Sequence, residues 1–276
     1  MRRGFTLIEV ALFLAVTGLL FAGVMVGVQN SIWQQRYNDT VQNFANFLRN
    51  VYSEVSNPQS SGNGRSEELA IYGKLISFGE KRGLDGAELD ANTQKVFVYD
   101  VVGDVNAAKV GSGSIIELLE KLDANAVVRT KDKDGVTVNA KLAGIVESYS
   151  PIWGSVIEAA KGDSEHAANN NLYKGSILIV RHPKSGAINT LVSDNVIEVN
   201  ETLKYADGSL VYDYIDELLT SKLSTFRLED ANFCVNPYGI GENGTTKRNI
   251  RIVKNARNSS GVEIIDLDSE NDKCSD

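Results

Sequence analysis

The amino-terminal apolar run limits what this chain can become more than any other feature. Residues 5–28 contain one ionisable side chain, the carboxylate of Glu9. As an α-helix these 24 residues are about 36 Å long, which exceeds the roughly 30 Å hydrocarbon core of a bilayer. The run therefore predicts a helix that spans a membrane once, with some tilt.

The charges beside the run predict its orientation. Arg2 and Arg3 precede it, and the next basic residue is Arg36. Basic residues stay on the cytoplasmic side, so we expect the amino terminus to lie inside and the rest of the chain to be exported. The formal net charge of the whole chain is −8, which argues against bulk attraction to nucleic acid or anionic lipid.

Two plain interpretations of the run are a cleaved secretory signal peptide and a simple single-span anchor. A signal peptide would have residues 10–22 as its apolar core and a cleavage site near Gly23. However, the apolar run continues to Val28, and Glu9 interrupts a region that should be free of charge. These features favour a third interpretation, based on residues 4–10.

The sequence Gly4-Phe5-Thr6-Leu7-Ile8-Glu9-Val10 resembles the processing motif of the type IV pilin and type II secretion pseudopilin superfamily. The resemblance is confined to the amino-terminal segment, but it combines a short basic leader, the Gly-Phe pair and the glutamate. It implies that residues 1–4 are a leader that a prepilin peptidase removes after Gly4. Phe5 would then become the methylated amino terminus, and residues 5–28 a transmembrane or filament-core helix.

The resemblance also gives Glu9 a role. A carboxylate inside a bilayer costs a few kcal/mol and needs a partner or a route to water. In a filament of parallel, stepped helices, Glu9 of one subunit can pair with the Phe5 amine of its neighbour, which makes the charge a register device. The implied partners are the prepilin peptidase, other pilin or pseudopilin subunits and the inner-membrane assembly machinery; no cofactor is implied.

A second periodic pattern follows the membrane segment. Apolar residues recur at spacings of three and four, which predicts an amphipathic helix over residues 29–57 that ends before Pro58. Together with the apolar run it would form one continuous helix over residues 5–57, about 80 Å long. The predicted buried stripe consists of Tyr37, Val41, Phe44, Leu48, Val51 and Val55.

The head, residues 58–276, reads as strands and loops, so the expected fold class is α+β. We expect the exported half of the long helix to pack on an antiparallel sheet, in a pilin-like layout. The stretch 103–174 is interpreted as an insertion or second lobe. Predicted strands are 95–102, 175–181, 187–192, 248–253 and 261–267, and predicted short helices are 114–122 and 212–222.

Cys234 and Cys274 are the only cysteines of the chain. In an exported head an intramolecular bridge is favoured, and family members often carry such a carboxy-terminal disulfide loop. Free or intermolecular cysteines are the alternative.

Motifs for catalysis are scarce. The only histidines are His166 and His182, and neither belongs to an H-E-x-x-H arrangement. Residues 239–244 spell G-x-G-x-x-G, but they lie between predicted strands and not between a strand and a helix, which favours a hairpin loop. We therefore expect no enzymatic activity.

Two acidic clusters raise the possibility of a calcium site. Residues 132–135 begin like an EF-hand loop, but Ala143 stands where the closing glutamate belongs, which favours a turn. The second cluster lies near the carboxyl end, where some pseudopilins bind calcium; a solvated acidic tail is the simpler interpretation. Its members are Asp266, Asp268, Glu270 and Asp272.

A basic cluster lies between the two cysteines and has two interpretations. It either contacts DNA phosphates during uptake, as reported for some minor pilins, or forms a solvated strand edge in which Ile250 and Ile252 face the core. No aromatic side chain in the cluster is available to stack on bases, which favours the strand edge. The cluster consists of Lys247, Arg248, Arg251, Lys254 and Arg257.

The expected function is a minor pilin of a type IV pilus, acting in adhesion, motility or DNA uptake. Many major pilins carry a proline within the apolar helix, whereas the first proline here is Pro58. The alternatives are a type II secretion pseudopilin and, from another class, a non-polymerising membrane-anchored receptor or adhesin. Before assembly the chain would cross the cytoplasmic membrane once, and afterwards it would belong to an extracellular or periplasmic filament.

Overall fold

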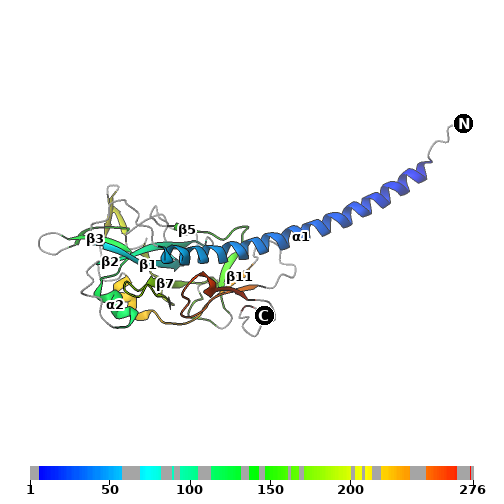
Figure 1. Cartoon of the computed structure of the whole chain (residues 1–276). Helices are drawn as coiled ribbons and strands as arrows, with labels where there is room; N and C mark the ends of the chain where they lie inside the picture. The colour runs from blue at the N-terminus through cyan, green and yellow to red at the C-terminus, as the bar shows by residue number, and fades with distance from the viewer. Residues whose placement is uncertain are drawn as a thin grey trace.

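The computed structural model consists of one long amino-terminal helix and a head of antiparallel sheets (Figure 1). It describes residues 6–57, 69–81, 89, 94–104, 113–131, 137–142, 147–160, 163–167, 171–199, 203–206, 209–212, 219–236, 247–265 and 274.

The long helix α1 spans Leu7–Ser56. It begins with a capping box at Thr6 and ends at Asn57, whose backbone N–H donates to the carbonyl of Ser53. Pro58 follows directly and disfavours the helical conformation of the residue before it. The continuous helix predicted over residues 5–57 is confirmed over Leu7–Ser56, with Thr6 and Asn57 as its caps and Phe5 outside the described residues.

The two halves of α1 have different surroundings. The amino-terminal half extends away from the head (Figure 1), and its large apolar side chains are exposed as far as Ile32. The carboxy-terminal half packs into the head, and all six residues of the predicted stripe are buried. Thr40, Ala45 and Tyr52 are buried as well.

A five-stranded antiparallel sheet has the order β5-β2-β1-β7-β8. The predicted strand 95–102 and the hairpin 175–192 are confirmed within it. The strands are β1 Leu69–Phe78, β2 Val96–Asp104, β5 Glu147–Tyr149, β7 Gly175–Arg181 and β8 Ile188–Ser193.

A four-stranded antiparallel sheet has the order β13-β12-β11-β6. It contains the predicted hairpin of 248–253 and 261–267, slightly shortened. The strands are β6 Val156–Ala159, β11 Ala231–Asn236, β12 Arg248–Ile252 and β13 Val262–Ile265.

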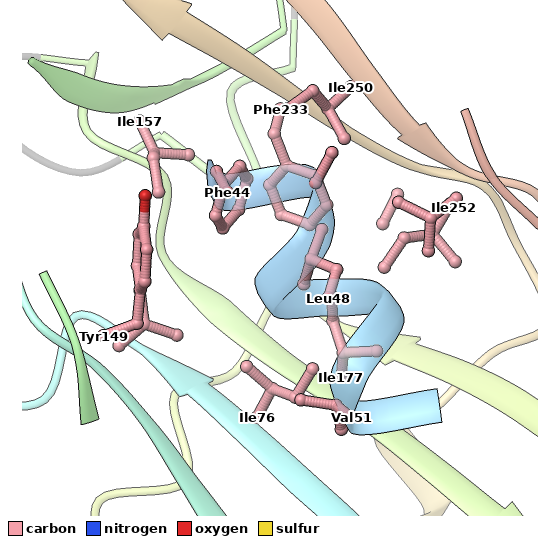
Figure 2. Packing of buried hydrophobic residues seen from close by; sticks show 14 of the residues in the cluster. Phe44, Leu48, Val51, Ile76, Tyr149, Ile157, Ile177, Phe233, Ile250 and Ile252 are labelled. Atoms are coloured by element: carbon pink, nitrogen blue, oxygen red, sulfur yellow. The ribbon is translucent and has the colours of Figure 1, made fainter. Parts of the chain in front are cut away.

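Both sheets contribute to one apolar core around α1. Figure 2 shows Phe44, Leu48 and Val51 of the helix among strand residues that include Ile177 and Phe233. Three polar contacts add to this packing. The Tyr37 hydroxyl donates to the Val235 carbonyl (3.0 Å), Arg49 Nη2 to the Val262 carbonyl (3.1 Å), and the Tyr52 hydroxyl lies 2.5 Å from Thr190 Oγ1.

A second core covers the other face of the five-stranded sheet. Neighbouring strand residues alternate between the two cores: Ile76 belongs to the first and Leu75 to the second, and Val98 and Phe97 divide in the same way. Because both faces are covered, these strands read as almost continuous apolar runs. The second core also contains residues of α2, Ile115–Lys121, a helix that was predicted and is capped by Ser114.

The remaining elements are small. β3 Val127–Lys131 pairs with β4 Thr137–Leu142, and β9 Leu203–Ala206 pairs with β10 Ser209–Tyr212, both in antiparallel fashion. One further α-helical turn, α4 Leu219–Lys222, and two 3₁₀ turns, η3 Leu223–Thr225 and η4 Ser259–Gly261, complete the described elements.

One prediction about the head is wrong at its first residue. The helix predicted over 212–222 does not include Tyr212, which pairs with Leu203 in the β9-β10 hairpin; Leu219–Lys222 is helical, and residues 213–218 lie outside the described residues. Within the stretch 103–174, β5 pairs with β2 and β6 pairs with β11, so these two strands belong to the main sheets. The interpretation of the stretch as an insertion or second lobe stays a prediction.

Candidate assembly site

The only carboxylate of the apolar run lies in the first turn of α1. Glu9 Oε2 accepts hydrogen bonds from the Thr6 backbone N–H (2.9 Å) and the Thr6 hydroxyl (2.8 Å). The backbone N–H of Glu9 donates back to Thr6 Oγ1 (3.4 Å). Glu9 therefore belongs to a capping box that holds the first turn together.

This arrangement orients the carboxylate without exhausting it. An ionised carboxylate has about four acceptor positions, and the two bonds from Thr6 both fall on Oε2. The exposed Glu9 side chain can thus accept a further cationic donor such as an ammonium group. Gly4 and Phe5 lie outside the described residues, so their predicted roles in processing stay predictions.

Thr6 is a residue of this site that we did not single out from the sequence. Its signal was present, because Thr6-Leu7-Ile8-Glu9 has the S/T-x-x-E pattern of a capping box immediately before an apolar run. The pattern fixes the beginning of the helix two residues after Phe5.

The apolar half of α1 forms a long exposed surface beside this carboxylate. Leu7 is 88% exposed and Leu19 is 76% exposed. Judged by length and composition, α1 is long and apolar enough to cross a membrane. Such a surface far exceeds the scattered apolar exposure that is normal for a soluble monomer, so it calls for a lipid or protein partner.

The two cysteines form the predicted disulfide. Cys234 on β11 and Cys274 lie with their Cα atoms 5.5 Å apart and are joined by a disulfide bond. Both are buried. The bridge attaches the carboxyl end of the chain to the middle of the four-stranded sheet.

Replacing Cys234 and Cys274 together by alanine is expected to lower the free energy of unfolding by about 2–4 kcal/mol. The bridge joins residues 40 positions apart, and its loss releases loop entropy in the unfolded chain. Urea titration of the detergent-solubilised chain, with the parent protein as reference, measures the difference. A change below about 0.5 kcal/mol would contradict a stabilising role.

A cavity of about 380 Å³ lies beside this bridge, and polar side chains of its wall have partners. Glu158 pairs with Lys247 (2.9 Å) and accepts a hydrogen bond from Asn236 Nδ2 (2.5 Å). Asp163 Oδ1 lies 3.0 Å from Nδ1 of His166, whose ring stacks on Tyr173 at a centroid distance of 5.2 Å. These contacts give the acidic groups structural partners.

The other histidine has a local role in a turn. His182 Nδ1 accepts hydrogen bonds from the backbone N–H groups of Lys184 and Ser185, each at 3.2 Å. Among the described residues, no group of three or more His, Cys, Asp or Glu side chains is arranged to hold a metal ion.

The structure places the predicted basic cluster along β12 and the turn after it. Ile250 and Ile252 are buried, as predicted. The predicted strand edge is wrong, however, because β12 lies between β11 and β13 and pairs with both. Arg251 Nη2 lies 2.6 Å from Glu263 Oε2, and Lys247 pairs with Glu158, so two of the five charges have acidic partners. Lys254 and Arg257 are exposed and Arg248 is half-buried. DNA contact by this cluster stays a prediction.

Three other predicted features lie outside the described residues. These are the glycine-rich stretch 239–244, the acidic turn 132–135 and the acidic tail with Asp266, Asp268, Glu270 and Asp272.

A partly buried ion network joins α1 to the five-stranded sheet. Lys74 Nζ lies 2.8 Å from Glu54 and 2.9 Å from Asp100. Burial lowers the pKa of Lys74, but hydrogen bonds to the two carboxylates outweigh it, so the pKa lies above its ordinary value. Burial, followed by repulsion from Glu54, raises the pKa of Glu147.

Glu147→Gln is expected to raise stability slightly at pH 7, with the gain disappearing at acidic pH. A carboxyl whose pKa is raised by folding destabilises the folded state while it is ionised, and the penalty fades as pH falls through the raised pKa. Thermal unfolding of the parent and the variant at pH 7 and at acidic pH tests this. Glu120→Gln, at an exposed carboxyl on α2, is the matched control; a pH-independent difference at Glu147 would contradict the account.

No family model, curated protein or solved structure matches this chain.

Proposed function

We propose that this protein is a filament-forming minor pilin subunit of a type IV pilus. In this proposal α1 inserts in the cytoplasmic membrane, a prepilin peptidase cleaves after Gly4, and the mature subunit enters a filament. The observation that carries the proposal is the division of one continuous helix. Its first half is apolar and exposed with a lone carboxylate at Glu9, and its second half is the centre of the head.

Physical chemistry supports two successive environments for the exposed half. Apolar surface gains about 25 cal/mol for each Å² removed from water, so the side chains from Leu7 to Ile32 favour lipid or other apolar helices. Glu9 is the exception, because a carboxylate is unfavourable in lipid until a cation reaches it. A bundle of these apolar helices, each with an amine at its start, would bury the apolar side chains and also supply a cation to Glu9.

The small residues of the helix fit such a bundle. An added Cβ at Gly18, Gly23 or Gly27 would meet nothing within 4 Å in the isolated chain. Packing inside the subunit therefore does not require glycine at these positions. In helix pairs without water, small residues allow backbones to approach closely, so the three glycines favour contact with neighbouring helices.

The head agrees with the resemblance at the level of layout. Antiparallel sheets pack on the exported half of the helix, and a disulfide closes the carboxy-terminal segment. The head folds around residues 37–55 of the same continuous helix that carries the exposed apolar half. The proposed assembly helix and the head are therefore joined without a linker.

Surface shearing tests polymerisation against a non-polymerising anchored receptor. The full chain is expressed in a host with a type IV pilus system, and sheared filaments are separated from membranes. We expect the chain in the sheared fraction, and only in the membrane when the host lacks its inner-membrane assembly machinery. Recovery solely with membranes in the competent host would contradict the proposal.

A further inference from the structure

We propose that the turn of residues 151–154, which carries Trp153, binds the phospholipid headgroup layer and seats the head on the outer membrane surface before assembly. The proposal rests on the membrane insertion proposed above and adds a second lipid contact to it.

The turn lies where α1 enters the head. The guanidinium carbon of Arg36 stands 4.7 Å from the centroid of the Trp153 ring. The carbonyl of Ile152 accepts a hydrogen bond from Thr40 Oγ1 (3.5 Å). Tyr37, between these two helix residues, is the first buried residue of α1. The turn is therefore fixed to the helix at the boundary between its exposed and buried halves.

This boundary lies at the depth of the headgroups. The apolar run ends at Val28, and Trp33 and Arg36 follow it by about 7.5 and 12 Å along the helix axis. Side chains on a helix lean toward its amino terminus, here toward the membrane. Indole rings concentrate at membrane–water interfaces, and guanidinium groups bind phosphate oxygens. Trp33, Arg36 and Trp153 together match this layer.

Core packing does not explain the conformation of Trp153. Its φ of 58° lies in the left-handed region, which costs a non-glycine residue roughly 1–2 kcal/mol. The side chain is 51% exposed, so core packing does not account for it. Gly154 follows with φ of 70°, and the Ser155 hydroxyl and N–H donate to the Ile152 carbonyl at 2.6 and 3.1 Å. The turn thus holds a large aromatic ring outward at a conformational penalty.

Depth-dependent quenching of Trp153 in the full chain tests the proposal. Trp33→Phe leaves Trp153 as the only tryptophan of the chain. The variant is reconstituted in vesicles of phosphatidylcholine and phosphatidylglycerol whose acyl chains carry bromine close to the headgroup or near the bilayer centre. We expect the emission maximum of Trp153 to lie at a shorter wavelength than that of free tryptophan in water. We also expect a greater loss of emission with the shallow bromine than with the deep one.

Ala187 provides a matched reporter at the far end of α1. It lies in the turn after Arg181, whose Nη1 donates to the Ser56 carbonyl (3.2 Å), and its own carbonyl accepts from the His182 N–H (2.8 Å). Ser56 lies 20 residues beyond Arg36, about 30 Å farther along α1. Ala187 is exposed, as Trp153 is about half exposed. Ala187→Trp, combined with Trp33→Phe and Trp153→Phe, should show no quenching by either lipid.

Vesicle flotation distinguishes a failure of the headgroup contact from a failure of the proposed membrane insertion. If the chain floats with the vesicles and neither lipid quenches Trp153, the headgroup contact is overturned and membrane insertion stands. Quenching that is equal at Trp153 and at the Ala187→Trp reporter would also overturn it, because the contact would be non-specific. If the chain does not float, the proposed membrane insertion fails and the headgroup contact fails with it. An emission shift of Trp153 that occurs only in filaments would assign the turn to a neighbouring subunit instead.

Discussion

Glu9→Ala is expected to insert and be processed normally, yet to be reduced at least tenfold in sheared filaments. In the proposed filament the mature Phe5 amine meets Glu9 of a neighbour in an apolar surrounding, and removal of one partner of a buried ion pair costs about 3–5 kcal/mol. In the membrane alone the substitution is favourable, because it removes a charge from lipid. Quantitative immunoblots of sheared and membrane fractions measure both effects.

Thr6→Ala is the matched control for the capping role of Glu9. It removes the hydroxyl that bonds Glu9 but keeps the carboxylate and the Thr6 backbone N–H. Loss of a capping side chain costs about 0.5–2 kcal/mol in the first turn, so filament incorporation should stay near that of the parent. If Thr6→Ala reduced incorporation as strongly as Glu9→Ala, the capping box would account for the effect. Parent-level incorporation of Glu9→Ala would contradict the pairing itself.

Phe44→Ala is expected to lower the free energy of unfolding by about 3–5 kcal/mol. The Phe44 side chain is fully buried, and its ring centroid lies 5.5 Å from that of Tyr149, 5.4 Å from Phe233 and 6.5 Å from Phe78. These residues come from both sheets, so the substitution opens a cavity where the helix joins them (Figure 2). Urea unfolding followed by near-ultraviolet circular dichroism measures the loss.

Phe47→Ala provides a comparison on the same helix face. Phe47 stacks on Tyr149 at 4.6 Å, but it is only partly buried. Its truncation leaves a smaller cavity that water can fill, so the loss should be clearly smaller than that of Phe44→Ala. Equal losses at the two positions would show that the core is not centred on Phe44.

The helix and the hairpins could be predicted because their signals are local. The spacing from Tyr37 to Val55 defines one helix face, and the structure buries all of it. The hairpin of β7 and β8 was visible as two apolar runs around Pro183 and Gly186. The helix predicted over 114–122 is α2, which Ser114 caps by accepting a hydrogen bond from the Glu117 N–H.

The arrangement of the sheets could not be predicted in this way. β1 pairs with β7 across about a hundred residues of sequence, and nothing local near Lys74 or Leu75 specifies that partner. The ion network of Lys74 with Glu54 and Asp100 depends on the same distant pairing. Tyr212 was assigned to a helix because its pairing with Leu203 depends on a hairpin that the composition did not reveal.

The capping box is a different case, since Thr6 and Glu9 carry the signal within four residues. The bond from Thr6 to Glu9 was missed because the carboxylate was interpreted only through its partner in a filament. The structure adds a local partner, and its two bonds on Oε2 leave acceptor positions of the carboxylate for the proposed filament partner.

The central claim is tested most directly by the intact mass and amino-terminal sequence of the chain isolated from cells that contain a prepilin peptidase. The account predicts a mature chain that begins at methylated Phe5, and an unprocessed chain in otherwise identical cells without the peptidase. Retention of Met1 in both strains, or a new amino terminus near Gly23, would contradict it.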